Sequence, residues 1–476
     1  MANFSLKWVK NNLKIESAYG QKALSEMPPY KNGQESEANA FFERLFSTIG
    51  ALKENAGLFN EFHRLFMGLR NISGTLNNLR NSMVLGETEL FEIKNFAIII
   101  SDIIKLCHKE NIESRLFANI KIEPVIKLLN PDSLITGSFY IHEAWSEKLK
   151  NIREQKKLIE AQILATMNGD EKSRLRAIRA NIVNDESDEE LNVRRMLSEK
   201  LKEYLPCLEF CAENVGKLEL LLAKAQMALE FGCGNVEIFD SDSIKSIVVE
   251  NAIEPELAEL LNKKGKLFTP VNIKVQKGVT ILTGANMGGK SVALSTIAFN
   301  TELVRYGFLP FAQRIAMKIP DFIEVISGDN QDANAGLSSF GADIKRLGVV
   351  LDKIKSSNGI VICDEFGRTT NPYEGSRFVK ALCDRLQKSN SFAILATHYD
   401  GICTANAAYY QVLGLKSILD RSLKSDSSCT DNLSDFMDYR LVESTMNSEV
   451  PREALKIATI LGLPEDFIES IKKYYN

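Results

Sequence analysis

The sequence predicts an α + α/β protein, in which a domain of long helices is followed by an α/β domain with a mostly parallel sheet. Three observations support this prediction. The chain is almost free of proline and has helical periodicity from about Glu37 to Ile253. After Asn262 it changes to short, continuous apolar runs, which are typical of buried parallel strands. A glycine-rich octet, Gly284–Ser291, directly follows the first of these runs.

The composition limits which kinds of protein this sequence can be. The chain has 476 residues, 45% apolar and 25% charged, as in ordinary globular proteins with two or three domains. Its formal net charge of −4 provides no global basic field that would draw it to DNA or anionic membranes, although local basic patches are compatible with that charge. Cys207 and Cys211 are four residues apart and are expected on one buried helix face rather than in a metal site. The sequence has no apolar stretch of about 20 residues, and its first residues do not resemble a signal peptide. We therefore expect a soluble, cytoplasmic protein without a membrane partner.

We predict three regions: an N-terminal segment over 1–40, a helical core and lever domain over 41–262, and a third domain over 263–476. Amphipathic helical patterns occupy 41–66, 91–107, 143–164 and 201–231. Several are longer than an average helix, which suggests rods that extend from a globular body. In the first pattern one apolar stripe is formed by Phe41, Leu45, Phe46, Ile49 and Leu52.

Between two of these patterns the sequence predicts the tip of a helical hairpin, near 168–195. Asn168-Gly169-Asp170 is a turn signal, and the acidic patch 184–190 is not expected to bury anything. The basic residues there could touch a phosphate backbone, or they could belong to a solvated face of mixed charge. These two interpretations are about equally supported. The candidate contacts are Arg174, Arg176, Arg179, Arg194 and Arg195.

The third region contains four apolar runs that we expect to be parallel strands. They cover 279–283, 322–326, 359–365 and 392–398, and amphipathic segments separate them. The octet after the first run fits the pattern G-x-x-x-x-G-K-[ST]. Its members are Gly284, Ala285, Asn286, Met287, Gly288, Gly289, Lys290 and Ser291.

This octet is the expected cradle for a phosphate. Its glycines would let backbone amides converge on phosphate oxygens, and the following helix would add its N-terminal amides. Lys290 would place its charge on the β- and γ-phosphates, and Ser291 would offer its hydroxyl to Mg²⁺. Taken alone, the octet could also be a glycine-rich turn without a ligand.

Two further runs end in polar residues. Asp364 would hold the Mg²⁺ through water, and Glu365 would polarise the attacking water. His398 closes another run and can donate a hydrogen bond to the γ-phosphate. A charged pair at a strand end is common by chance, so neither observation is decisive alone. Because ligands bind at the carboxyl ends of strands in an open α/β sheet, the three ends together predict a nucleotide site.

The stretch 327–344, SGDNQDANAGLSSFGADI, places Ser338 and Ser339 before a run that could start a helix. Hydroxyls and free amides at a helix N-terminus form an anion site. Since the octet would already hold the phosphates of its own chain's nucleotide, this helix is expected to serve the γ-phosphate of a second subunit. We therefore expect a head-to-tail homodimer with two composite sites.

The segments GANMGGKS, LSSF, DEFGRTTNPYEG and ATHY resemble the ATPase domain of the MutS family, which belongs to the ABC-type ATPases. The resemblance covers roughly Leu267 to Tyr475 and is very specific. It implies ATP and Mg²⁺ as cofactors, and a homodimer whose long helices form a clamp gated by ATP. It also implies roles for Lys290, Ser291, Asp364 and Glu365 in the Walker motifs, Gln331 in the Q-loop, Ser338 and Ser339 in the trans-acting signature, Asn371 in the D-loop, and His398 as the switch histidine.

The sequence also departs from the family pattern. Ala285 and Val292 stand where the family usually has proline and threonine, but neither position carries the phosphate chemistry. Mismatch-reading members have an N-terminal domain with a Phe-x-Glu wedge, and the segment 1–40 contains no such motif. SGDNQD and TNPYEG are more similar to the branch that does not recognise mismatches and carries a C-terminal nuclease domain. We expect this chain to lack that domain too.

Three functions stay open at this point. The first is a DNA-associated ATPase clamp that holds duplex or branched DNA through its helical arms without reading mismatches, which kinship favours. The second is an ATP-driven remodelling clamp that acts on an unidentified protein partner, which the net charge favours. The third is a scaffold with a decayed ATPase, which the complete set of phosphate-directed residues disfavours. Salt dependence of DNA binding would distinguish the first two.

Overall fold

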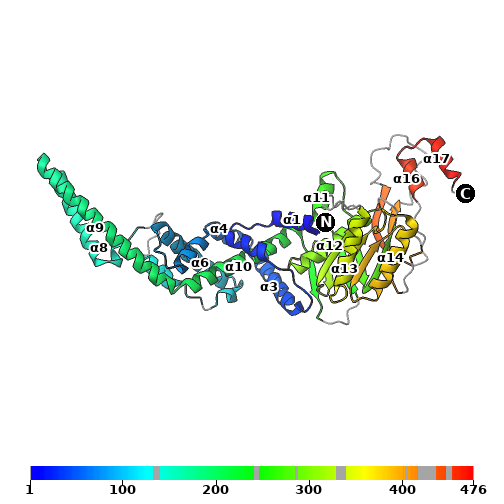
Figure 1. The fold of residues 1–476 in the computed structure, drawn as a ribbon, viewed down its shortest axis with the longest axis horizontal. Helices are drawn as coiled ribbons and strands as arrows, with labels where there is room; N and C mark the ends of the chain where they lie inside the picture. The colour runs from blue at the N-terminus through cyan, green and yellow to red at the C-terminus, as the bar shows by residue number, and fades with distance from the viewer. Residues whose placement is uncertain are drawn as a thin grey trace. The chain divides into compact units, whose positions relative to one another are not determined.

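The computed structural model describes residues 2–118, 120–131, 140–240, 246–284, 288–327, 339–399, 401–402, 406–415, 436–445 and 453–474 (Figure 1). The chain divides into two compact units. We call Met1–Leu13, Pro28–Glu43 and Met227–Asn476 the sheet unit, and Lys14–Met27 and Arg44–Gln226 the helical unit. Helices α3 (Glu35–Glu54) and α10 (Leu205–Phe231) contribute to both units. The domain ranges 1–40, 41–262 and 263–476 stay a prediction.

The helical unit has α6 (Glu87–Lys109) at its core. Ile93 and Ile100 of this helix are fully buried, and α4 (Leu58–Met67) and α7 (Glu123–Leu129) pack against it. The predicted patterns at 41–66, 91–107, 143–164 and 201–231 are confirmed as α3 with α4, α6, α8 and α10. The remaining elements of the unit are α2 (Ala18–Glu26), α5 (Ser73–Arg80), η1 (Ser114–Phe117) and η2 (Glu143–Trp145).

Helices α8 (Glu147–Ala165) and α9 (Gly169–Lys202) lie side by side as a hairpin (Figure 1). The side chain of Asn168 accepts hydrogen bonds from the backbone N–H groups of Asp170 at 3.0 Å and Glu171 at 3.4 Å, which caps α9. The turn signal at Asn168 is therefore confirmed. The connection is confined to residues 166–168, and the rest of the range 168–195 belongs to α9.

The acidic patch at 184–190 requires a correction, because it was expected to bury nothing. Glu186 is buried, and its carboxylate accepts a hydrogen bond from Arg153 Nε at 3.0 Å and another from Lys156. Burial alone would raise the pKa of Glu186, but these hydrogen bonds outweigh it, so the pKa is lowered. Helical spacing turns Glu186 and Glu190 toward Arg153 of α8, while Asp185 and Asp188 are exposed.

A four-stranded sheet of order β1-β5-β2-β3 lies in the sheet unit. β1 pairs parallel with β5, whereas β2 is antiparallel to both β5 and β3. Two of its strands fall within the range predicted as helical up to Ile253, so that prediction is wrong for them. Burial alternates over 246–249, the period of a strand. The strands are β1 (Asn235–Ile238), β2 (Ser246–Ala252), β3 (Val271–Gln276) and β5 (Arg314–Met317).

The second sheet has six strands in the order β10-β9-β4-β8-β7-β6. All neighbours are parallel except β10 and β9, so the predicted mostly parallel sheet is confirmed. The four predicted strands correspond to β4, β6, β7 and β8. The bounds are β4 (Gly278–Thr283), β6 (Phe322–Ser327), β7 (Gly359–Asp364), β8 (Phe392–Ala396), β9 (Ala408–Leu415) and β10 (Met437–Ser444).

Helices α13 (Ser339–Lys353) and α14 (Pro372–Gln387) supply one apolar core of this sheet (Figure 1). Val350 and Leu382 pack there with Val361 and Leu395 of the central strands. Helix α12 (Lys290–Arg305) contacts strands of both sheets, and α1 (Ala2–Asn12) packs on it. The other helices are α11 (Pro255–Lys263), α16 (Ala454–Ile460) and α17 (Glu465–Lys472).

Candidate nucleotide-binding site

The register of the six-stranded sheet aligns the three predicted strand ends. Leu282 of β4 and Asp364 of β7 both pair with Ala396 of β8, the strand between them. The backbone N–H of Thr397 donates to Leu282 O, and the N–H of Glu365 donates to Ala396 O, both at 3.1 Å. The residues that follow these strands therefore lie side by side at the carboxyl edge of the sheet, where open α/β sheets bind ligands.

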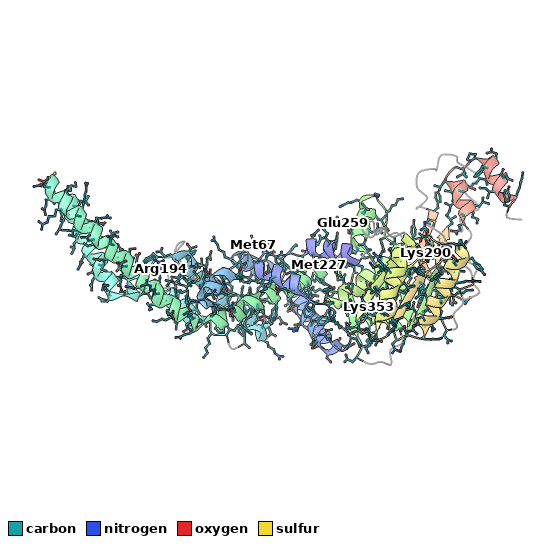
Figure 2. The ribbon with its side chains drawn as sticks, viewed as in Figure 1. Met67, Arg194, Met227, Glu259, Lys290 and Lys353 are labelled. Atoms are coloured by element: carbon teal, nitrogen blue, oxygen red, sulfur yellow. The ribbon has the colours of Figure 1, made fainter. Side chains whose placement is uncertain are left out.

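Lys290 lies at this edge as the first residue of α12 (Figure 2). Its side chain is only 5% exposed, and its Nζ donates to Gly284 O at 2.9 Å and lies 3.5 Å from Glu365 Oε1. Gly289, immediately before it, has a φ of 87°, a left-handed conformation that favours glycine. The structure thus brings together Lys290 and Glu365, which are 75 residues apart by their numbers in the sequence.

Glu365 has an unusual backbone conformation and two cationic neighbours. Its φ of 51° lies in the left-handed region, where non-glycine residues are uncommon and strained. One carboxylate oxygen faces Lys290, and the other accepts a hydrogen bond from Arg368 Nη1 at 3.0 Å. Both oxygens of this carboxylate therefore have a cationic partner, and the side chain is only 15% exposed.

The residues at the edge suit Mg²⁺ held together with a nucleotide. Asp364 offers a carboxylate at the end of β7, and Ser291 is an exposed hydroxyl in the first turn of α12. Mg²⁺ prefers such oxygen ligands and usually shares them with substrate phosphates. Within the described ranges, no group of three or more His, Cys, Asp or Glu side chains could hold a metal ion by itself. The donor set therefore fits a metal that phosphate oxygens help to coordinate.

His398 is exposed at the same edge, and its ring lies 4.3 Å from the ring of Tyr399, centroid to centroid. Asn371 caps α14, because its side chain accepts a hydrogen bond from the N–H of Tyr373 at 2.9 Å. Helix α13 begins at Ser339, as the expected helix start requires. Several predicted site residues lie outside the described residues: Ala285, Asn286, Met287, Gln331, Ser338 and the side chain of Ser339.

Three residues near the site were not identified from the sequence. Arg368 contacts Glu365, and Tyr399 donates from its hydroxyl to Gly367 O at 2.8 Å. The sequence indicates these two residues only by their closeness in the chain to Glu365 and His398. Tyr439 of β10 lies so close to Gly289 that a Cβ there would be 2.9 Å from its ring. No local pattern could have indicated Tyr439, because it comes from a distant edge strand.

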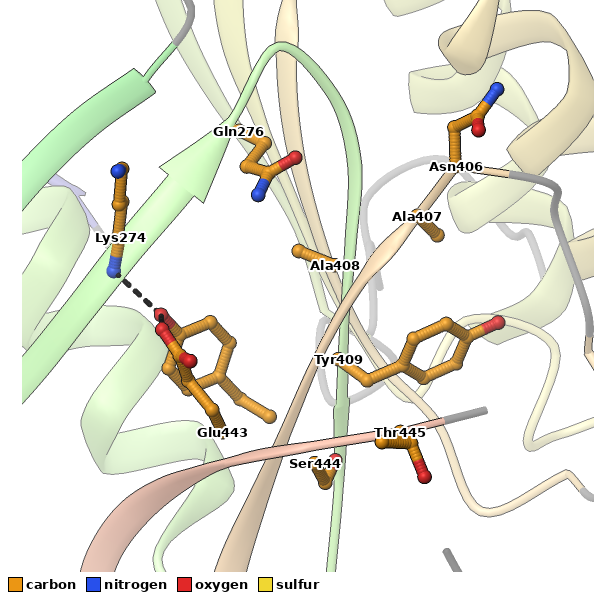
Figure 3. Close-up of a pocket in the computed structure, with 10 residues that line it drawn as sticks. Lys274, Gln276, Asn406, Ala407, Ala408, Tyr409, Glu443, Ser444 and Thr445 are labelled. Carbon is orange, nitrogen blue, oxygen red and sulfur yellow. Dashed lines mark hydrogen bonds between the residues drawn. The ribbon is translucent and has the colours of Figure 1, made fainter. Parts of the chain in front are cut away.

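A polar pocket lies beside the edge strands β9 and β10 (Figure 3). It is lined by Lys274 and Gln276 of β3, by the start of β9 and by the end of β10. The N–H of Lys274 donates to the Tyr410 hydroxyl at 3.1 Å, as the dashed line shows. The start of β9 pairs with Thr280 in the middle of β4, and none of the residues that line the pocket is a residue of the predicted site. This pocket is therefore separate from it.

The arginines of the hairpin differ in their surroundings. Arg174, Arg176 and Arg195 are exposed. Arg179 is half-buried and lies 2.7 Å from Glu160 of α8, and Arg194 is half-buried on α9 (Figure 2). The exposed three are the better candidates for contact with a partner. Among the described residues, no helix combines the length and the apolar character needed to cross a membrane.

Comparison with known proteins agrees with the resemblance to the MutS family. The family described as MutS domain V matches residues 280–476. The chain is 31% identical to an Endonuclease MutS2 from Fusobacterium nucleatum over 61% of its own length and 35% of that protein. It is 26% identical to the Endonuclease MutS2 of Caldanaerobacter subterraneus and to that of Carboxydothermus hydrogenoformans, over 58% and 60% of its length. The matched segments span about a third of these relatives, at 35%, 32% and 35%.

Proposed function

The chain belongs to the MutS family, and on that premise we propose that it is an ATPase that works as a homodimeric, DNA-associated clamp without mismatch reading. One observation carries the proposal. At the carboxyl edge of the sheet, Lys290 Nζ lies 3.5 Å from the carboxylate of Glu365, the residue that follows β7. A buried lysine after a glycine-rich loop and a carboxylate at a strand end are what phosphoryl transfer to water requires. A cytoplasmic location is part of this proposal.

Each residue has a separate task in the proposed reaction. The loop Gly284–Ser291 would bind the phosphates, and Ser291 and Asp364 would hold Mg²⁺, which supplies charge neutralisation at the phosphates. Lys290 would exchange its interactions with Gly284 O and Glu365 for phosphate oxygens. Glu365 would then accept a proton from the attacking water as general base. His398 would donate to the γ-phosphate.

Two substitutions test the assignment of this site. Lys290→Ala should weaken ATP binding at least about tenfold, because it removes the charge that meets the β- and γ-phosphates. Glu365→Gln should bind ATP normally but hydrolyse it at least about a hundredfold more slowly, since an amide cannot accept the proton. Lys263→Ala, which changes an exposed lysine in the same unit, is the matched control. Equal ATP affinity of wild type and Lys290→Ala would refute the site.

DNA is the partner we propose for the α8–α9 hairpin. Binding would rest on phosphate contacts from exposed arginines, and each lost contact should reduce the slope of log K against log salt by about 0.9. We expect the double variant Arg174→Gln/Arg176→Gln to bind duplex DNA more weakly and with a smaller slope. Arg70→Gln, which changes an exposed arginine elsewhere in the helical unit, should leave the slope unchanged.

Mismatch reading is not expected, because intercalation at a mispair needs an apolar wedge and contacts that repay the unstacking. Homoduplex and single-mismatch duplex should therefore bind within about threefold of each other, less than the 1.4 kcal/mol of a tenfold preference. A clear mismatch preference at matched salt would contradict this. The alternative partner is a protein, which the net charge of −4 and the pairing of Arg179 with Glu160 favour. Absence of DNA binding even at low salt would make that alternative the leading one.

A further inference from the structure

Tyr399 connects three segments at the carboxyl edge of the sheet. It follows His398 after β8, and its N–H donates to Thr397 Oγ1 at 3.1 Å, which holds its backbone at the strand end. Its hydroxyl donates to Gly367 O at 2.8 Å, in the turn after β7. The ring itself packs against the apolar core under α13 and α14. The phenol is therefore held at both ends, by the core and by this hydrogen bond.

The third segment is the first turn of α14, where Gly375 leaves room for the hydroxyl. A Cβ on Gly375 would lie 2.2 Å from Tyr399 Oη and 2.8 Å from Gly367 O. Gly367 has a φ of 79°, so its conformation also favours glycine. The phenol, the Gly367 carbonyl and the Gly375 Cα thus form a close three-way contact that a single methyl group would disrupt.

This contact lies in the turn that sets the position of Glu365. The N–H of Arg368 donates to Glu365 O at 3.1 Å and closes the turn around Gly367. Glu365 itself is strained, with a φ of 51°. A strained residue keeps its conformation only when its surroundings over-determine it. Anchoring the Gly367 carbonyl is one such constraint, and it comes from the same strand end as His398.

We propose that Tyr399 is a positioning residue for ATP hydrolysis, whose hydroxyl holds the Gly367 turn so that the Glu365 carboxylate stays aligned for its role as base. The inference rests on the proposed ATPase function. Burial, and secondarily the charge of Glu365, raise the pKa of the Tyr399 phenol. The hydroxyl consequently stays protonated and able to donate throughout the neutral range.

Tyr399→Phe tests the proposal, because it deletes the hydroxyl and keeps the ring. We expect kcat to fall about fivefold, the effect of one neutral hydrogen bond, with KM for ATP within about twofold of wild type. In a Glu365→Gln background the same change should have almost no further effect on kcat, because Tyr399 acts through Glu365. A merely structural role would instead lower activity equally in both backgrounds.

Tyr410→Phe is the matched control. Its hydroxyl accepts from Lys274 N and donates to Glu443 Oε1, and neither of these partners belongs to the Gly367 turn, so kcat should not change. If Tyr399→Phe does not fold, Gly375→Ala disturbs the same contact from the other side and should show the same kcat loss at constant KM. Normal kcat in the folded Tyr399→Phe variant, or an equal loss in the Glu365→Gln background, would overturn the inference while leaving the ATPase proposal intact. A wild-type protein that does not hydrolyse ATP would refute both.

Discussion

At the scale of single residues, the proposed site depends on backbone conformations that few side chains adopt. Glu365, Gly289 and Gly367 have φ values of 51°, 87° and 79°. Two of these positions are glycines, which adopt the left-handed region without steric cost. Glu365 has a Cβ, so the same conformation is sterically unfavourable there. The strain is concentrated at the residue expected to act as base, which is where strained residues commonly occur in enzymes.

Gly289→Ala should selectively weaken ATP binding. The new Cβ would lie 2.9 Å from Tyr439 in addition to the strain at a φ of 87°. Either the ring or the loop must move, and the loop's amides would lose their alignment on phosphate. We expect at least a tenfold weaker Kd for ATP, measured by equilibrium binding, which corresponds to about 1.4 kcal/mol.

Gly265→Ala tests the effect of backbone strain in the absence of a steric clash. Gly265 has a φ of 70°, but nothing lies within 4 Å of its Cβ position. This variant should lose about 1–2 kcal/mol of unfolding free energy and keep its ATP affinity. If both variants bound ATP as wild type does, the loop would not be the phosphate cradle.

At the scale of elements, the α8–α9 hairpin is held together more by charge than by apolar packing. Helix α9 has 34 residues, of which only six side chains are buried, including Leu175, Val193 and Leu197. Arg153 bridges Glu186 at 3.0 Å and Glu190 at 2.7 Å, so one arginine from α8 binds two carboxylates of α9. Partly buried ion pairs of this kind cost stability when one partner is removed.

Glu186→Gln should loosen the hairpin. It would leave two half-buried cations without their shared carboxylate, at a cost of about 1–3 kcal/mol. Amide hydrogen exchange at pH 7 should become faster in α8 and α9, whereas Glu199→Gln, which changes an exposed glutamate paired with Lys202 of the same helix, should change nothing. Unchanged exchange in the Glu186 variant would show that the ion pairs of Glu186 do not hold the hairpin together.

The effect of Glu186→Gln should also depend on pH. The pKa of Glu186 is lowered from 4.5 in the folded protein, so its contribution to stability is present above that value. The contribution is lost as the pH falls through the folded pKa. We therefore expect the difference in hairpin stability between wild type and Glu186→Gln to shrink below about pH 4.5, measured by urea unfolding followed by circular dichroism.

At the scale of the whole molecule, the proposed homodimer makes each ATP site depend on two chains. The sequence places Ser338 and Ser339 at the start of α13, which the structure begins at Ser339. The residues of one chain that we propose to face its own nucleotide, around Lys290 and Glu365, come from other elements. Composite sites of this kind would make hydrolysis conditional on dimerisation.

Mixing two inactive variants tests the composite site. Ser338→Arg should block the action of one chain on its partner's nucleotide, and Glu365→Gln should disable the base within its own chain. If the sites are composite, a mixed dimer regains one site in which both groups are intact, so the mixture should hydrolyse ATP faster than either variant alone. No recovery, in a mixture shown by labelled subunits to exchange, would contradict action in trans.

Much of the site could be predicted from local pattern. The octet Gly284–Ser291 and the ends of β7 and β8 are recognisable because each consists of residues that are neighbours in the chain. Their convergence also follows from a general property of parallel sheets, whose carboxyl ends share an edge. The observed register, in which Leu282 and Asp364 both pair with Ala396, agrees with that expectation.

What the sequence by itself determined was the order of elements, the long helices and the parallel strands, together with the prediction that residues after these strands face phosphate. Only the tertiary structure decided that Glu186 is buried, that β1 and β2 replace expected helix, and that Tyr399 and Tyr439 reach the site. The physical reason is the range of the interactions. Helix period and turn chemistry act between residues a few positions apart, whereas burial and close approach depend on which distant segments pack together.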